Sequence, residues 1–230
     1  MLVFMLRGVL VSLEIFFLTL IFSVPLALPL ALGRMSKNWV LRNIINIYLL
    51  VMRGTPLILQ LIFIYFAPSY LYRFLQDSLS GYIDSTVFWG ILKTLLSYDR
   101  FVAVIIAFVL NYAAYFAEIY RGGIESISKG QYEAAKVLGF TKPQTFSRII
   151  LPQVAKRILP ASGNEVITLV KDTALAQTIG IAELFHVAQN AASSKFSTTP
   201  IFIAGLFYLI MNWFVSCAFR TAEKKLSYYS

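Results

Sequence analysis

Hydrogen-bonding and charged side chains recur on one face of the apolar segment 158–181. Asn164, Thr168 and Lys171 follow each other at steps of four and three residues, so a helix places them on one side. Glu165 and Asp172 lie seven residues apart on an adjoining stripe. A charge inside a bilayer costs about 2.5–3.5 kcal/mol, so these groups should face a partner, a cavity or the interior of a helix bundle. Side chains of these types could bind a polar solute reversibly.

Another charged group, Arg53, interrupts the apolar segment 44–67. Gly54 follows it directly, and Pro56 comes soon after. Proline removes a backbone hydrogen-bond donor, so we expect a helix to bend or break at this point. Arg53 has two candidate partners, which are the carboxylate of a bound solute and Glu14 in the first apolar segment.

Polar groups also occur in the segment 101–120. Tyr115 lies three residues after Tyr112 and four residues after Asn111, and these side chains could hydrogen-bond a solute or hold helices together. Glu118 and Arg121, at the end of the segment, are spaced for a local ion pair. The small residues of this segment favour close helix packing; they include Ala103, Ala107, Ala113 and Ala117.

The sequence lacks the residues for covalent or metal catalysis. His186 and Cys217 are the only residues of their types, so one chain cannot form a disulfide framework, a zinc cluster or a Cys/His nucleophilic pair. No G-x-x-x-x-G-K-[ST] loop is present to hold the phosphates of ATP. We therefore expect a protein that is not an enzyme and that binds no metal or cofactor itself.

The overall composition indicates a membrane protein. Of the 230 residues, 58% are hydrophobic and 13% are charged, against roughly 45–50% and 25% in soluble domains. A membrane-crossing helix needs about 20 mostly apolar residues, and five segments qualify: 10–32, 44–67, 101–120, 158–181 and 201–218. The sequence predicts an all-α membrane protein with about five transmembrane helices in a single domain, residues 1–230.

The distribution of basic residues predicts the orientation of these helices. Of the 20 basic residues, 13 lie in the connection after the first segment, the connection 121–157 and the C-terminal tail, and five lie on the opposite side. Basic connections stay preferentially in the cytoplasm. We expect the N-terminus outside and the C-terminus in the cytoplasm. This arrangement explains the net charge of +9 without a nucleic-acid partner.

A long connection, residues 68–100, is expected on the outer side. Its apolar part, residues 88–96, is too short to cross the membrane. An interfacial or re-entrant helix is the interpretation that this length favours.

The connection 121–157 contains helix signals that a simple tether would not need. Ser128 and Gln131 have the spacing of a capping box, which predicts a helix start. Gly139 suits the left-handed conformation after a helix end. Thr141, with Pro143 in the first turn, should open a second helix. A short capped helix outside the membrane is typical of a docking element.

The spacing of this connection resembles the EAA signature of ATP-binding-cassette (ABC) importer permeases. Glu133, Ala134 and Ala135 are followed by Gly139, Ile149, Leu151 and Pro152 at the spacing of that signature. Three further segments resemble the polar amino acid permease branch, and they are residues 53–57, 118–124 and 164–173. The resemblance covers most of the chain from residue 52 to residue 191.

The resemblance implies that the chain is one half of a translocation pathway that works by alternating access. The implied partners are a second permease subunit, identical or homologous, a cytoplasmic ABC ATPase dimer that holds ATP and Mg²⁺, and an extracytoplasmic amino-acid-binding protein. The connection of about 122–157 would couple to the ATPase through Gln131, Glu133, Ala134, Ala135, Gly139, Leu151 and Pro152. The substrate pathway would be lined by Arg53, Thr55, Asn111, Tyr115, Asn164, Glu165, Thr168, Lys171 and Asp172.

The expected function is therefore the import of polar or basic amino acids across a bacterial inner membrane. Lys171 and Asp172 have a second interpretation, because they could pair with other helices or with the second subunit. The alternative function is an ion-gradient-driven transporter or channel for small solutes, in which carboxylates such as Glu14, Glu165 and Asp172 carry protons or ions. Five spans without an internal repeat argue against that architecture.

Overall fold

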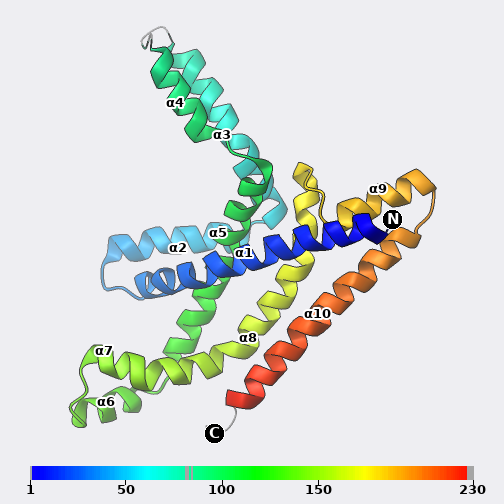
Figure 1. The fold of residues 1–230 in the computed structure, drawn as a ribbon. Helices are drawn as coiled ribbons and strands as arrows, with labels where there is room; N and C mark the ends of the chain where they lie inside the picture. Colours follow the sequence, from blue (N-terminus) through cyan, green and yellow to red (C-terminus); the bar gives the residue numbers. More distant parts are fainter. Residues whose placement is uncertain (1, 81–82, 84, 227–230) are drawn as a thin grey trace.

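The computed structural model describes residues 2–80, 83 and 85–226, and this part of the chain is helical (Figure 1). The longer helices are α1 (Leu2–Arg34), α2 (Trp39–Gly54), α3 (Leu57–Leu79), α5 (Arg100–Glu125), α8 (Leu151–Asp172) and α10 (Thr199–Leu226). The shorter elements are α4 (Thr86–Leu96), α6 (Lys129–Val137), α7 (Lys142–Gln144), the π-helix η1 (Thr145–Ile150), the 3₁₀-helix η2 (Thr173–Ile179) and α9 (Leu184–Lys195).

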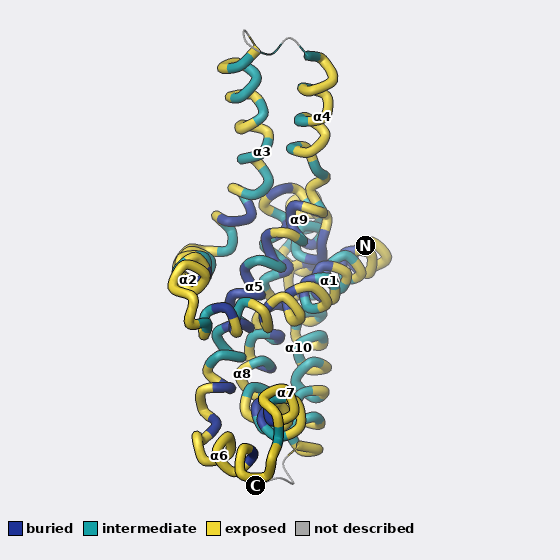
Figure 2. The backbone as a smooth tube through the Cα atoms, turned by 90° about the vertical axis from the view of Figure 1, so that its left-hand side faces the viewer, coloured by how far each residue is buried: buried dark blue, intermediate teal, exposed yellow. Residues whose placement is uncertain are grey.

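The core lies where α5 crosses α1 (Figures 1 and 2). Small side chains from both helices are buried there, and they include Ser12, Thr19, Ala27 and Ala31 of α1. Ala103, Ala107, Ala113 and Ala117 of α5 are at most 1% exposed, which confirms their predicted packing role. Small side chains let helix backbones approach closely, and this approach provides much of the packing between helices in a membrane.

One membrane span expected from the sequence, residues 44–67, is divided. Helix α2 ends at Gly54, and α3 begins at Leu57 after the extended residues Thr55 and Pro56. The single-span prediction was wrong, because Pro56 has no N–H for a continuous ladder. The predicted break beside Arg53 is confirmed.

The helix expected over residues 158–181 also differs from the prediction. Helix α8 ends at Asp172, the chain continues as η2, and Gly180 closes it in the left-handed conformation with φ +82°. Within the described part of the chain, four helices are long and apolar enough to cross a membrane: α1, α3, α5 and α10. Helix α8 is not one of these four, because the polar side chains on one of its faces lower its overall hydrophobicity.

The connection 68–100 contributes to an antiparallel helical arm, and its apolar part lies in a helix, as the sequence predicted. Helix α3 continues past Pro68 to Leu79, and α4 returns beside it after the turn (Figure 1). Ser85 starts α4 by accepting a hydrogen bond from the N–H of Phe88 at 3.3 Å. Tyr72 and Trp89 make an edge-to-face contact between the two helices, with ring centroids 6.3 Å apart. No residue of α4 is buried (Figure 2).

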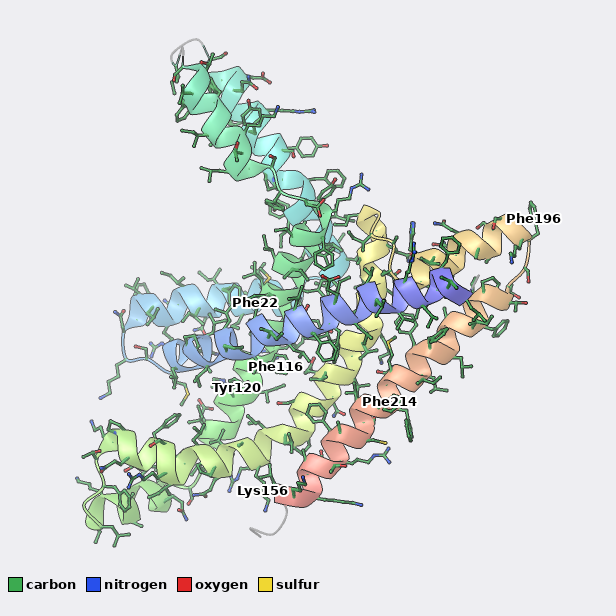
Figure 3. The ribbon with its side chains drawn as sticks, in the orientation of Figure 1. Phe22, Phe116, Tyr120, Lys156, Phe196 and Phe214 are labelled. Carbon is green, nitrogen blue, oxygen red and sulfur yellow. The ribbon has the colours of Figure 1, made fainter. Side chains whose placement is uncertain are left out.

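The last two helices are joined by a turn with an unusual residue. Phe196 follows α9 in the left-handed conformation, with φ +47°, and its side chain is 98% exposed. Figure 3 shows Phe196 at the tip of the turn between α9 and α10. At the other end of α9, the buried Glu183 accepts hydrogen bonds from the N–H groups of Phe185 and His186, and from the hydroxyl of Tyr208 on α10.

Candidate functional site

A central pocket of about 450 Å³ opens where the break between α2 and α3 faces α5 and α8. Its volume falls within the range of roughly 300–1,000 Å³ that is usual for small-molecule sites. Polar and apolar side chains alternate on its wall: Thr55, Pro56, Leu57, Ile58, Asn111, Tyr112, Tyr115, Glu165, Thr168, Asp172 and Leu175. The packing of α5 against α8 brings these segments together.

Asp172, at the end of α8, is fixed by a residue of α5. The hydroxyl of Tyr112 donates a hydrogen bond to Oδ2 of Asp172 at 2.7 Å. Tyr112 is itself 2% exposed and stacks against Phe108. A buried phenol that holds one carboxylate oxygen leaves the other oxygen of Asp172 available to the pocket.

The helix break is held by a buried pair of amides. The Asn111 side-chain nitrogen donates to the carbonyl of Met52 and to the side-chain oxygen of Gln60, both at 2.9 Å. The Gln60 side-chain nitrogen donates to the carbonyls of Met52 and Thr55 and to the Thr55 hydroxyl, at 2.8–3.1 Å. These bonds satisfy carbonyls that the broken helix leaves unpaired. Asn111 is therefore engaged in holding α2 and α3 together.

Arg53 does not pair with Glu14, so that interpretation was wrong. Its guanidinium lies 3.3 Å from the carboxylate of Glu118 and 5.7 Å from the centre of the Tyr115 ring. Glu14 lies on an exposed part of α1. The tertiary packing of α2 against α5 selects Glu118, which the sequence separation from Arg53 did not reveal.

Glu118 is the centre of an ionic cluster formed with Arg34, Arg53 and Arg121. Arg121 binds Glu118 at 2.5 Å, which confirms the predicted local ion pair, and it also binds Glu125. Arg34, the last residue of α1, binds the same Glu118 carboxylate. One carboxylate thus joins the ends of α1 and α2 to α5 beside the central pocket.

An apolar groove lies on the other side of α5. Phe116 and Tyr120 lie between α1 and α8 (Figure 3). The Tyr120 hydroxyl donates to the carbonyl of Val24 at 3.4 Å. The lining of this groove is almost entirely apolar, so it differs from the polar central pocket.

The central pocket contains six of the nine predicted pathway residues. Thr55, Asn111, Tyr115, Glu165, Thr168 and Asp172 line it. Arg53 lies beside it through its contact with Tyr115. Asn164 and Lys171 are outside its wall, and both are exposed on α8.

The second candidate site is the short helix α6 in the connection 121–157. It begins after Ser128 and ends before Gly139, as the sequence predicted. The predicted capping box at Ser128 was wrong, because its hydroxyl accepts no hydrogen bond and the Gln131 side chain instead accepts from Gln153 of α8 at 3.3 Å. A complete capping box forms at Thr141, which starts α7.

The end of α6 is fixed by its backbone. Gly139 has φ +81°, its N–H donates to the carbonyl of Lys136, and the N–H of Phe140 donates to the carbonyl of Ala135. This pair of bonds is the Schellman motif, in which glycine is favoured because it has no Cβ. Nothing lies within 4 Å of a Cβ added at Gly139, so only its backbone conformation restricts a substitution.

Helix α6 presents an apolar tip. Val137 is 88% exposed and Leu138 is 73% exposed, beside the exposed Tyr132. Of the predicted coupling residues, Gln131, Glu133, Ala134, Gly139, Leu151 and Pro152 are exposed. Ala135 is fully buried. Its small side chain therefore serves the packing of α6 within the chain, and it cannot contact a partner directly.

Two groups at these sites were not identified from the sequence, and the partner of a third was not. Gln60 is an amide within the apolar first part of α3, which is a signal that could have marked it. Tyr112 was expected, like Asn111 and Tyr115, to hydrogen-bond a solute or hold helices together, and only the fold shows that it binds Asp172. The exposure of Val137 and Leu138 depends on where α6 ends, and a capped helix with an apolar end could have indicated it.

Comparison with known proteins identifies related chains. Residues 23–228 match the family described as "Binding-protein-dependent transport system inner membrane component". The nopaline transport system permease protein NocM of Agrobacterium fabrum (strain C58) is 34% identical over 220 residues, which are 95% of this chain and 86% of that protein. The putative glutamine transport system permease protein GlnP of Rickettsia felis is 34% identical over 224 residues, 97% of this chain and 93% of that protein.

A solved structure is also similar along its whole length. The crystal structure of an amino acid ABC transporter with histidines matches with a TM-score of 0.78 and 30% sequence identity. The match covers 96% of this chain and 94% of that one.

Proposed function

Because the chain belongs to the family of binding-protein-dependent transport system inner membrane components, we propose that it forms one half of the translocation pathway for polar or basic amino acids. It is a permease subunit of an ABC importer in the inner membrane, and ATP hydrolysis belongs to a separate subunit. The relatives named for nopaline and glutamine, and the transporter crystallised with histidines, support an amino acid as the substrate.

The central pocket is the observation that carries this proposal. It combines two carboxylates, an amide and several hydroxyls with apolar walls, and two of the helices that line it, α3 and α5, are long and apolar enough to cross a membrane. Polar groups are costly at that depth, so they are expected where a polar substrate passes. Thr55, Tyr115, Glu165, Thr168 and Asp172 are the residues that we assign to the pathway, with Arg53 at its edge. Asn111 lines it while holding the helix break.

Asn164 and Lys171 belong to the same pathway at a different place. Both are exposed on the face of α8 that the chain itself leaves uncovered. A second permease subunit, identical or homologous, would close the pathway opposite this face. In that arrangement, Lys171 contacts either the moving substrate or the second subunit, and its charge does not remain exposed to lipid.

The apolar tip of α6 is the proposed docking surface for the ATPase dimer. Val137 and Leu138 would enter a pocket of the ATPase, with Glu133, Ala134 and Gln131 at the edge. Closure of the ATPase on ATP would move α6 and the adjoining η1 and α8, and so open the central pocket outward. Hydrolysis would reverse the movement. This chain binds no cofactor in this cycle, because ATP and Mg²⁺ belong to the ATPase.

The proposed topology places the N-terminus outside and the C-terminus in the cytoplasm. The excess of basic residues around α6 and at the end of α10 supports it. An extracytoplasmic binding protein would then deliver the amino acid near the start of α5 and near α9. The arm formed by α3 and α4 also belongs to the outer side in this topology.

The experiment that tests the proposal is uptake by proteoliposomes that contain this subunit with its ATPase and binding protein. We expect uptake of a polar or basic amino acid that needs ATP and survives the collapse of ion gradients by ionophores. Uptake that persists without ATP and stops with the ion gradient would overturn it. Amino-acid-stimulated ATPase activity, measured across a panel of amino acids, gives an independent readout of coupling.

A further inference from the structure

The apolar groove beside α5 extends over two adjoining cavities. Their volumes are about 350 Å³ and about 310 Å³, and both lie between α1, α5 and α8. The two cavities have four lining residues in common, which are Val24, Tyr120, Ala155 and Ile158. Apart from Ser162 and the hydroxyl of Tyr120, the side chains that line them are apolar. The two cavities therefore form one continuous apolar groove.

The groove is open on the surface of helices that belong to the membrane. Of the four long helices that line it, α1, α5 and α10 are long and apolar enough to cross a membrane, and the fourth is α8. Val24, Leu28 and Leu151 line the groove and are still 37–43% exposed. Apolar surface at membrane depth contacts lipid hydrocarbon unless another protein covers it.

The proposed place of the second permease subunit is on another face of α8. That subunit would cover Asn164 and Lys171, which the chain leaves exposed. Ser162, in the groove, precedes Asn164 by two residues and Lys171 by nine. At 3.6 residues per turn, each of them lies about 180–200° around the helix axis from Ser162. The groove is therefore on the opposite side of α8 and stays open to lipid.

The length of the groove suits one acyl chain of a single leaflet. Along α5 the groove runs from Phe116 to Ile124, and along α8 it runs from Leu151 to Val166. At 1.5 Å per residue, these distances are about 12 Å and about 22 Å along the helix axes. Half of the hydrocarbon core of a bilayer is roughly 15 Å thick. An extended acyl chain can therefore follow the groove over the depth of its leaflet.

One end of the groove adjoins a basic surface. Ile124 is the second to last residue of α5 and Leu151 is the first of α8, so the groove ends at the connection 121–157. This connection has seven basic and two acidic residues. Arg148 lies between Phe146 and Leu151, which both line the groove, and it is exposed. None of the ion pairs among the described residues includes Arg148. Its guanidinium is available to an anionic headgroup, which basic residues at the cytoplasmic ends of membrane helices attract.

We propose that the apolar groove is a binding site for an anionic phospholipid of the cytoplasmic leaflet. One acyl chain lies along Phe116, Tyr120 and Ile158, and the phosphate group contacts the guanidinium of Arg148. The site is separate from the central pocket, which lies on the other side of α5. Its assignment to the cytoplasmic leaflet rests on the proposed topology, whereas binding of the lipid does not depend on which amino acid is transported.

Phosphatidylglycerol with a photoreactive diazirine in one acyl chain tests the site. The complete complex of both permease subunits and the ATPase is placed in phosphatidylcholine nanodiscs with a small, constant fraction of this probe. After illumination, labelled peptides are identified by mass spectrometry, and we expect label in the segments 116–124 and 154–166. Exchanging part of the phosphatidylcholine for unlabelled phosphatidylglycerol should decrease this labelling about fivefold, because the added anionic lipid competes for the site. Labelling of Phe202 and Leu209, which are exposed on α10, should stay nearly constant.

Two substitutions locate the two parts of the lipid. Ala155→Phe fills the middle of the groove, because Ala155 lines both cavities, and most of the groove labelling should be lost. Its control, Val215→Phe, adds a phenylalanine to a separate apolar cavity of about 330 Å³ between α1 and α10, and labelling of 116–124 should be unchanged. Arg148→Gln should remove the preference for phosphatidylglycerol over phosphatidylcholine. Lys129→Gln, the same change of charge at the exposed start of α6, should retain it.

The outcomes separate the lipid site from the proposed function. If the groove of the wild-type complex is not labelled, another occupant such as the second subunit covers it, and the proposal is overturned. Equal competition by phosphatidylglycerol and phosphatidylcholine would overturn the anionic headgroup, and undiminished labelling in Ala155→Phe would overturn the position of the acyl chain. Amino acid uptake is measured separately, so it can fail while the lipid site holds. The exchange of lipids around the wild-type complex decides the question even if a variant does not assemble.

Discussion

The phenolic hydroxyl of Tyr112 lies 2.7 Å from Oδ2 of Asp172, and it connects the most buried helix of the bundle to the end of the polar helix α8. Helix α8 ends at Asp172, where the chain changes to the 3₁₀-helix η2. The bond therefore fixes a carboxylate at a change of helix type. Without this bond, Asp172 would be one of the less well positioned residues of the pocket, because it lies at the end of a helix.

Removing this hydroxyl by Tyr112→Phe should weaken binding of the transported amino acid about threefold to tenfold, because Asp172 loses the bond that orients it. A buried hydrogen bond of this kind contributes on the order of 1 kcal/mol to stability, so unfolding should occur at a modestly lower temperature. Tyr48→Phe is the matched control, since the Tyr48 hydroxyl donates to the carbonyl of Leu110 outside the pocket. It should lower stability without changing the dissociation constant. Equal binding by the Tyr112 and Tyr48 variants would contradict the positioning role.

The buried amides of Gln60 and Asn111 should act as one unit. Gln60→Leu or Asn111→Leu leaves buried polar partners unsatisfied, which costs about 1–3 kcal/mol. Because both residues satisfy the same broken helix, the double variant should lose clearly less stability than the two single losses together. Thermal unfolding of the purified complex in lipid nanodiscs measures this non-additivity. Strict additivity would mean that the two amides act independently.

Gly139→Ala should impair coupling through the backbone. The left-handed conformation costs a residue with a Cβ about 1–2 kcal/mol, so the end of α6 should shift or fray. We expect ATPase stimulation and uptake to fall together while membrane insertion is unchanged. Gly130→Ala is the control: it lies inside α6, has no positive φ, and nothing lies within 4 Å of its added Cβ. Full coupling in the Gly139 variant would show that the Schellman end of α6 is dispensable.

The apolar tip of α6 should be needed for binding of the ATPase and not for folding of this chain. Replacing Val137 and Leu138 together by serine removes side chains that are 88% and 73% exposed, so the stability of the chain should change by less than about 0.5 kcal/mol. Co-purification of the ATPase should decrease strongly. Replacing Ala135 by serine tests the opposite case, because Ala135 is fully buried and its substitution should disturb the chain itself. Unchanged ATPase binding by the Val137/Leu138 variant would remove the proposed docking surface.

Local signals in the sequence predicted several features correctly. The break beside Arg53 follows from Pro56, and the end of α6 follows from Gly139, because each depends on the backbone of one residue. The ion pair of Glu118 with Arg121 follows from helix geometry. The polar stripe of α8 was visible as a periodic pattern, since helical periodicity does not require knowledge of the fold.

Tertiary contacts account for what the sequence could not predict. The pairing of Arg53 with Glu118 instead of Glu14 depends on which helix packs against α2. The Ser128 capping box fails because Gln131 meets Gln153 of α8, more than twenty residues away. Asn111 was assigned to the pathway because its type suits a solute, yet the fold commits its side-chain nitrogen to Met52 and Gln60. Where a side chain has both a local and a distant candidate partner, tertiary packing decides which of the two it contacts.

The arm of α3 and α4 has a consequence for the energetics of the whole chain. No residue of α4 is buried, and its main contact with the rest of the chain is with α3. Opening α4 therefore exposes none of the core where α5 crosses α1. In hydrogen exchange, its amides should exchange as a separate cooperative unit, with protection far below that of α5. Sequence changes in the arm should therefore have little effect on the stability of this core, and the arm can diversify without altering the central pocket.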